Sequence, residues 1–157
     1  MELVASATAK ADLSDSATTV SVRKFANAKQ STNVLGLAAA TSDARTYLVL
    51  KNLHTWKQPE VLYHVYLTPK AGVGVNKNSY VGAINFFDAE FHDHGGGSKL
   101  DAALGENFFS FDVTELLRRF ERSGTVSREA MQVTFVPGGK ARADAGAMVA
   151  TVELVRQ

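Results

Sequence analysis

Apolar and polar residues alternate along several short segments of the chain, which is the spacing expected of β-strands. In the segment 46–53 the alternating residues are largely β-branched or aromatic, and such residues are enriched in strands. Pro59, Pro69 and nearby glycines interrupt the pattern, as turn residues do. The pattern predicts seven strands and, in a weakly patterned region, a further short strand at 34–37. The seven segments are 19–23, 46–53, 61–67, 80–87, 108–113, 131–136 and 148–155.

One segment has the spacing of an amphipathic helix instead. Leu116 and Phe120, with the leucine between them, fall on one helical face, opposite a group of arginines. Asp112 is of a residue type that accepts backbone N–H bonds as an N-cap, and Glu115 follows it at the spacing of a capping box. Gly124 is a typical C-terminal stop. The sequence therefore predicts a helix that begins after Asp112 and ends at Gly124.

The predicted strands are not separated by helices, so a parallel β-α-β sheet is not expected. We expect an all-β protein in the main: an antiparallel β-sandwich or jelly-roll-like fold with one short helix. The 157 residues match the size of one domain, which can bury a core without disulfides. The sequence predicts a single domain over 1–157, in which 1–45 is a weakly patterned N-terminal segment and 46–157 is the core.

Charge and cysteine content narrow the range of functions. Lys and Arg together number 17 and Asp and Glu 16, so the net charge of +1 offers no basic footprint for nucleic acid or an anionic membrane. The absence of cysteine excludes disulfides, thiol catalysis and Cys-ligated zinc. No apolar run approaches the roughly 20 residues that span a bilayer, and the first five residues lack a signal-peptide pattern. We expect no nucleic-acid or membrane partner, and the compartment stays undefined.

The most suggestive group of candidate metal ligands is His92-Asp93-His94, which three glycines follow. Two histidines two positions apart on an extended segment point to the same side and could share a metal ion. No spacing in the chain indicates a third ligand. The alternative is a solvent-exposed polar loop in which Gly95 to Gly97 form tight turns.

Trp56 is predicted to lie in the turn 54–59 between two strands. It could contact a partner there as an exposed aromatic, or it could cap the end of the sandwich. His64 lies within an apolar strand, and we expect it to be half-buried and hydrogen-bonded to a neighbour. Nucleophilic catalysis finds little support, because no serine lies in a Gly-x-Ser-x-Gly motif.

Several segments, in order along the chain, resemble the C-terminal domain of tyrosinases and polyphenol oxidases, the type-3 copper oxidases, particularly the bacterial ones. The run Phe109 to Leu117 is similar to the Lys-Phe-Asp-Val signature of plant polyphenol oxidases, with Ser110 in place of the lysine. The resemblance spans nearly the whole chain and is clearest over 46–157. The other segments that carry it are Glu2 to Ser6 (resembling the linker into that domain), Tyr80 to Phe87, His94 to Gly96, Gln132 to Pro137 and Val152 to Gln157.

The resemblance implies a jelly-roll-like domain that packs over the active-site entrance of a tyrosinase-like catalytic domain and keeps the enzyme latent. In that family the catalytic domain is a four-helix bundle that binds two coppers through six histidines, whereas this chain has four histidines and one predicted helix. The chain is therefore expected not to be an enzyme and to hold no cofactor, with copper in the partner domain. Phe91 and Trp56 are the candidates to enter the active site, since an aromatic side chain there must mimic a phenol in an apolar pocket.

Two other functions remain open. The chain could be a stand-alone β-sandwich binding module for a protein or a carbohydrate, because a fold does not determine a function. It could also be a small metal-binding protein or metal-dependent enzyme that uses His92 and His94. Affinity for sugars would favour the binding module, and stoichiometric binding of copper or zinc would favour the metal-binding protein.

Overall fold

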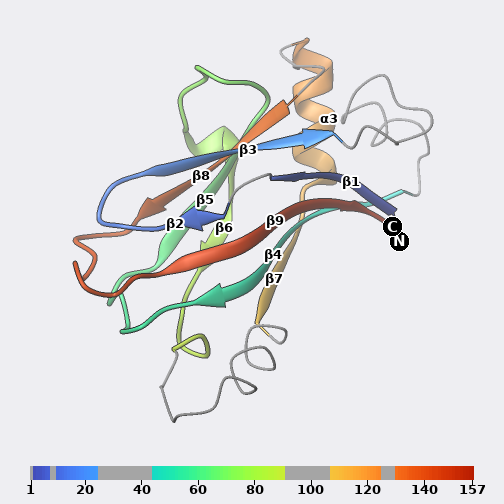
Figure 1. The fold of residues 1–157 in the computed structure, drawn as a ribbon. Helices are drawn as coiled ribbons and strands as arrows, with labels where there is room; N and C mark the ends of the chain where they lie inside the picture. Colours follow the sequence, from blue (N-terminus) through green and yellow to red (C-terminus); the bar gives the residue numbers. More distant parts are fainter. Residues whose placement is uncertain (1, 8–9, 25–43, 91–106, 125–129) are drawn as a thin grey trace.

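The computed structural model describes residues 2–7, 10–24, 44–90, 107–124 and 130–157. In these residues the chain forms nine strands, one α-helix and one short 3-10 helix (Figure 1). The strands are β1 (Glu2–Ala7), β2 (Ala11–Asp12), β3 (Thr18–Lys24), β4 (Thr46–His54), β5 (Tyr63–Thr68), β6 (Tyr80–Ile84), β7 (Phe108–Asp112), β8 (Ala130–Pro137) and β9 (Met148–Arg156). The helices are η1 (Lys77–Ser79) and α3 (Thr114–Ser123).

The nine strands belong to one antiparallel sheet with the order β6-β5-β8-β3-β1-β9-β4-β7, and β2 also pairs with β9. The sheet curls until its two edge strands meet: a Cβ built on Gly82 in β6 would lie 2.6 Å from the ring of Phe111 in β7. The result is a nearly closed, barrel-like sheet (Figure 1). The expected mainly β, antiparallel fold with one short helix is confirmed. The strands that face each other across the core belong to one continuous sheet.

Strand β9 lies in the interior of this sheet and pairs with three other strands. It pairs with β4 from Thr46 opposite Arg156 to His54 opposite Met148. Its other edge pairs with β1, where Glu2 lies opposite Arg156, and with β2. The two ends of the chain therefore lie side by side (Figure 1).

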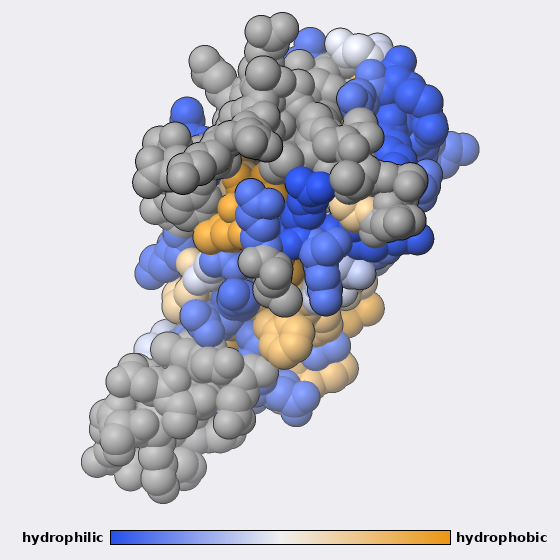
Figure 2. Space-filling view, turned by 90° about the vertical axis from the view of Figure 1, so that its right-hand side faces the viewer, coloured by the Kyte–Doolittle hydropathy of each residue, from blue (hydrophilic) through white to orange (hydrophobic). Residues whose placement is uncertain are grey.

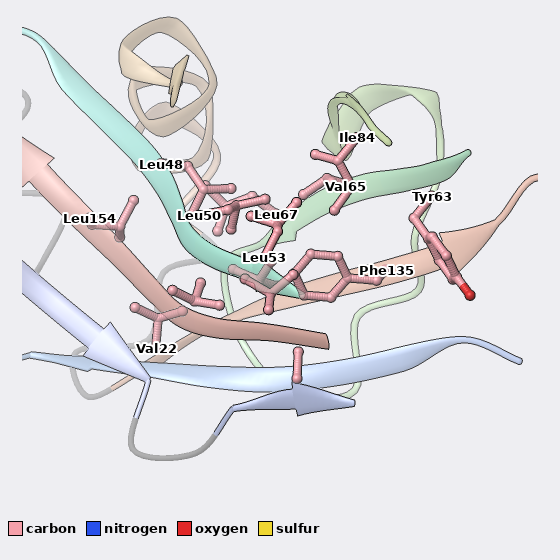
Figure 3. Close-up of a cluster of buried hydrophobic side chains, with 14 of the residues drawn as sticks. Val22, Leu48, Leu50, Leu53, Tyr63, Val65, Leu67, Ile84, Phe135 and Leu154 are labelled. Atoms are coloured by element: carbon pink, nitrogen blue, oxygen red, sulfur yellow. The ribbon is translucent and has the colours of Figure 1, made fainter. Parts of the chain in front are cut away.

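The hydrophobic core lies inside the curled sheet. Figure 3 shows leucines of β4 facing side chains of β5 and β8 across the interior. Leu50, Leu67 and Phe135 are fully buried there, because every second residue of a strand points to the same face. Burial of such a side chain contributes roughly 1.5–3 kcal/mol to stability.

The start of helix α3 differs from its predicted start. Val113 is the N-cap residue and makes no side-chain capping bond. The Asp112 carboxylate instead accepts a hydrogen bond from the backbone N–H of Thr114 at 3.0 Å. Glu115 pairs with Arg118 at 2.7 Å and forms no capping box. Asp112 thus accepts a backbone N–H as predicted, but the predicted N-cap position and the capping box were wrong, because Asp112 still belongs to strand β7 and Val113 is the N-cap.

The other boundaries follow the sequence pattern with two exceptions. All seven predicted strands are present as β3 to β9, and Gly124, with a φ of 69°, ends α3 as predicted. The predicted segment 80–87 remains a strand only as far as Ile84. Residues 2–7 form β1, so their interpretation as a linker is wrong. The short strand expected at 34–37 lies outside the described residues. No helix in the described ranges is long and apolar enough to cross a membrane.

The contact that closes the barrel can be tested at Gly82. Gly82→Ala is expected to lower the free energy of unfolding by about 1–3 kcal/mol, because the added methyl would overlap the Phe111 ring. Gly74→Ala is the matched control, since a Cβ there meets no atom within 4 Å, and its effect should stay within about 0.5 kcal/mol. Urea denaturation measures both. In a Phe111→Ala background, Gly82→Ala should lower the free energy of unfolding by less. An equal decrease in both backgrounds would contradict the contact between Gly82 and Phe111.

A buried hydrogen bond joins α3 to β4 and offers a second test. The backbone N–H of Thr46 donates to Oγ1 of Thr114 at 2.8 Å. Thr114→Val keeps the shape but removes the acceptor, so it should lower the free energy of unfolding by about 1–3 kcal/mol. The hydroxyl of Thr46 is buried and has no hydrogen-bond partner among the described residues, so Thr46→Val should be neutral or stabilising. Unfolding curves in which Thr46→Val is less stable than Thr114→Val would contradict this explanation.

Candidate docking surface

Three large aromatic side chains are exposed at one end of the barrel. Trp56 is 54% exposed, Phe87 72% and Phe108 63%. Trp56 follows the end of β4, Phe87 follows the end of β6, and Phe108 is the first residue of β7. These strand ends lie toward the bottom of the view in Figure 1. We call the surface formed by Trp56, Phe87 and Phe108 the aromatic end.

Hydrogen bonds hold the three segments of the aromatic end together. The backbone N–H of Thr55 donates to the carbonyl of Ala89 at 3.0 Å. The Asn107 side chain donates to the carbonyl of Asp88 at 2.9 Å, and the Asn107 carbonyl accepts from the Asn52 backbone N–H at 2.9 Å. Because each segment is tied to the next, the aromatic end is a preformed surface.

Trp56 is anchored on one side and open on the other. Its backbone N–H donates to the carbonyl of Ala145 at 2.8 Å, and its ring meets that of His54 edge-on, with the centroids 4.7 Å apart. A Cβ on Gly146 would lie 2.6 Å from Cδ1 of the indole, and the φ of Gly146 is 66°. Only glycine fits under the ring there. Trp56 thus combines packing against the end of the barrel with an accessible aromatic face.

Sequence reasoning did not single out Phe87 and Phe108. Phe87 was predicted to be the last residue of the strand 80–87, but β6 ends at Ile84. The Asn85 side chain accepts a hydrogen bond from the Phe87 backbone N–H at 3.1 Å in the turn that follows. Phe108 lies on the same face of β7 as Ser110, and both are exposed. That shared parity with a polar residue is the signal that could have placed Phe108 on the outside.

A small pocket of about 180 Å³ opens beside Phe108. Its walls are polar at Asp88 and Asn107 and apolar at Leu53 and Ala89. It is smaller than the roughly 300 Å³ at which typical small-molecule sites begin. The aromatic end is therefore better suited to contact another protein than to enclose a substrate.

Charged side chains lie next to Trp56. Asp144 accepts hydrogen bonds from Lys57 at 2.8 Å and from Arg142 at 2.7 Å. These two bonds lower the pKa of the Asp144 carboxyl to about 2. The pKa of His54 is lowered from 6.5 by burial and, to a smaller extent, by the positive charge of Lys10. Trp56 thus has the ion pairs of Asp144 on one side and, in contact with its ring, His54, which favours the neutral form.

The face of the molecule shown in Figure 2 is mixed in character. Hydrophobic residues form separate patches on it, between hydrophilic ones. A partner on that side would meet apolar contacts broken by polar and charged groups. Interfaces between proteins commonly have this composition.

His64 lies away from these aromatics, on β5. Its Nδ1 is 3.1 Å from the hydroxyl of Tyr80 on β6, and it is half-buried. The expectation of a half-buried, hydrogen-bonded histidine is confirmed. Its role is accounted for by cross-strand packing.

The remaining candidates from the sequence, Phe91, His92 and His94, lie outside the described residues. Glu90, which precedes Phe91 in the chain, is at the aromatic end, where it accepts a hydrogen bond from the Gln58 side chain at 3.0 Å. Within the described part of the chain, no group of three or more His, Cys, Asp or Glu side chains is arranged to hold a metal ion.

The chain belongs to the family described as "Domain of unknown function (DUF7868)", whose sequence model matches residues 1–157. No curated protein matches the sequence. Among solved structures, the fold is similar to "Latent aurone synthase (polyphenol oxidase) from natural source", with a TM-score of 0.51 and 16% identity over 92% of this chain and 25% of that chain. A recombinantly expressed latent aurone synthase (polyphenol oxidase) has a TM-score of 0.51 and 18% identity over the same shares.

The matched part of those enzymes is their C-terminal region. This chain therefore spans about a quarter of the length of the structures that it resembles. At this level of identity the similarity shows a common fold. The resemblance to the C-terminal domain of polyphenol oxidases, inferred from short motifs, is thus confirmed for the fold.

The lowered pKa of His54 gives the aromatic end a pH dependence. Because the folded state favours neutral His54, the stability from this residue is present above the unfolded pKa of 6.5 and is lost as the pH falls through the lower folded pKa. His54→Gln should flatten the loss of stability between about pH 7 and pH 5. Lys10→Gln should flatten it in part. Fluorescence of Trp56, the one tryptophan of the chain, reports the unfolding, and an unchanged slope in both variants would contradict the assignment.

Proposed function

We propose that this chain is a non-catalytic domain that covers the active-site entrance of a tyrosinase-like copper oxidase domain, and that it docks through the aromatic end. The observation that carries the proposal is the exposure of Trp56, Phe87 and Phe108 together at one end of a fold shared with the C-terminal region of latent polyphenol oxidases. The copper and the catalytic residues belong to the partner domain, and this chain supplies a cover.

The physical argument is that a phenol-binding site is complementary to an aromatic side chain. An indole or phenyl ring that enters such a site excludes water and competes with a phenolic substrate. Trp56 suits this role because its backbone is fixed to Ala145 while about half of the residue is exposed. Glu90 is at this end, and Phe91, which follows it directly in the chain, remains the second candidate.

The position of the chain ends is consistent with this arrangement. His54 lies opposite Met148 at one end of β9, whereas Glu2 lies opposite Arg156 at the other end. These two ends of β9 are roughly 25 Å apart at the rise of a strand. The aromatic end is therefore not obstructed by the paired first and last strand ends.

The proposal can be tested by adding the chain to the type-3 copper catalytic domain of the same organism, prepared without a cover. Catechol oxidation should fall to a plateau as the chain is added. Replacing Trp56, Phe87 and Phe108 by Ala should weaken this inhibition by about tenfold or more, because buried aromatics dominate such interfaces. Val75→Ala is the matched control. Val75 is 40% exposed and lies in the loop between β5 and η1, at the other end of these strands, so the variant should inhibit as the unchanged chain does.

Two results would count against the proposal. Undiminished oxidation at saturating chain would remove the covering role. Stoichiometric copper in the isolated chain, together with turnover of a phenol, would make the chain an enzyme itself. Metal analysis and a phenol-oxidation assay on the copper-loaded chain are therefore the first measurements to make.

A further inference from the structure

A second hollow lies at the other end of strands β5 and β6, away from the aromatic end. It is formed between the loop that joins β5 to η1 and the last turns of α3, near the top of Figure 1. Its volume is about 580 Å³, within the range of roughly 300–1,000 Å³ that small-molecule sites occupy. Pro69, Val73 and Phe120 give it apolar walls, and Asn76 and Asn78 give it polar ones.

The hollow is electropositive. Arg119 is the one charged residue among those that line it in the described part of the chain. The loop 69–79 carries Lys70 and Lys77 and no carboxylate. The acidic residue one helical turn before Arg119, Glu115, is already engaged by Arg118 at 2.7 Å. Glu121, the other carboxylate of α3, is not among the described residues that line the hollow. An anion in the hollow would therefore face a positive group and no carboxylate of the lining.

Arg119 is held at the hollow but keeps most of its hydrogen-bonding capacity. Its Nη2 donates to the carbonyl of Asn78 at 3.4 Å, and its side chain is exposed. A guanidinium has five N–H donors, which match the two oxygens of a carboxylate. Among the described residues the guanidinium makes no other hydrogen bond, so several donors can serve a ligand.

The loop that forms the opposite wall is already ordered. The Asn76 side chain accepts the backbone N–H of Asn78 at 2.8 Å, and the Asn76 backbone N–H donates to the hydroxyl of Ser79 at 3.1 Å. This reciprocal pair caps η1. A ligand would thus bind without first having to fold the loop, which favours affinity.

We propose that this hollow binds a small organic anion with an apolar body. The carboxylate pairs with the guanidinium of Arg119, and the body lies against Val73 and Phe120. This inference is independent of the covering role, because it concerns other residues at the other end of the barrel. A purely structural role for Arg119 is the competing explanation, since its guanidinium joins α3 to the loop through the carbonyl of Asn78.

The test is an NMR titration of the ¹⁵N-labelled chain with phenylacetate, and with the uncharged 2-phenylethanol as a matched ligand. Phenylacetate should shift the amides of Val73, Gly74, Asn78 and Phe120 in a saturable way, with a dissociation constant of about 1 mM or lower. Arg119→Gln should weaken binding by about tenfold, while its dispersed spectrum reports that it is folded. Arg122→Gln removes the same charge from an exposed position of α3 outside the hollow and should change the affinity less than about twofold.

Each other outcome overturns the proposal. Absence of saturable shifts, or shifts centred elsewhere, removes the site. Equal affinity for 2-phenylethanol removes the anion preference. If Arg119→Gln lowers the unfolding temperature but leaves the affinity for phenylacetate unchanged, Arg119 has only a structural role.

Discussion

Backbone hydrogen bonds between β9 and its neighbours β1 and β4 hold the barrel together. Through them residues from both ends of the chain lie side by side in the interior of the sheet. The position of β4 then fixes where Trp56 leaves the barrel, and the meeting of β6 and β7 at Gly82 fixes the far edge. Few of these pairings are local, so folding is expected to depend on slow, long-range strand association.

The sequence predicted strands where alternation was strong and failed where side chains were small. β4, β5 and β9 carry β-branched and aromatic residues, and their patterns matched the structure. β1 and β2 were not predicted because alanines there serve as core residues: Ala5 and Ala11 are fully buried although alanine carries little strand signal. In the candidate site, Trp56 could be identified from its turn. Phe87 could not, because hydrophobicity alone predicts burial and the turn at Asn85 directs it outward. For Phe108 the one signal was its shared parity with the polar Ser110.

The two surfaces described here differ in what they can bind. The aromatic end has large exposed rings, a small pocket and an ionic network at Asp144, which together suit a protein partner. The hollow beside α3 has a single cation above apolar walls, which suits a small anion. Because they lie at opposite ends of β5 and β6, a ligand in one leaves the other accessible. The barrel thus carries two different candidate binding surfaces at its two ends. The strand pattern in the sequence did not predict this separation.

The pairing of Glu2 with Arg156 also determines how the protein responds to mechanical force. A pull applied to the two chain ends acts on neighbouring antiparallel strands from the same side. The hydrogen bonds between β1 and β9 are then loaded one after another, starting at Glu2, and not all at once as in shear. Such peeling needs little force, so tension transmitted through the ends would open the barrel between β1 and β9 and leave β9 paired with β4.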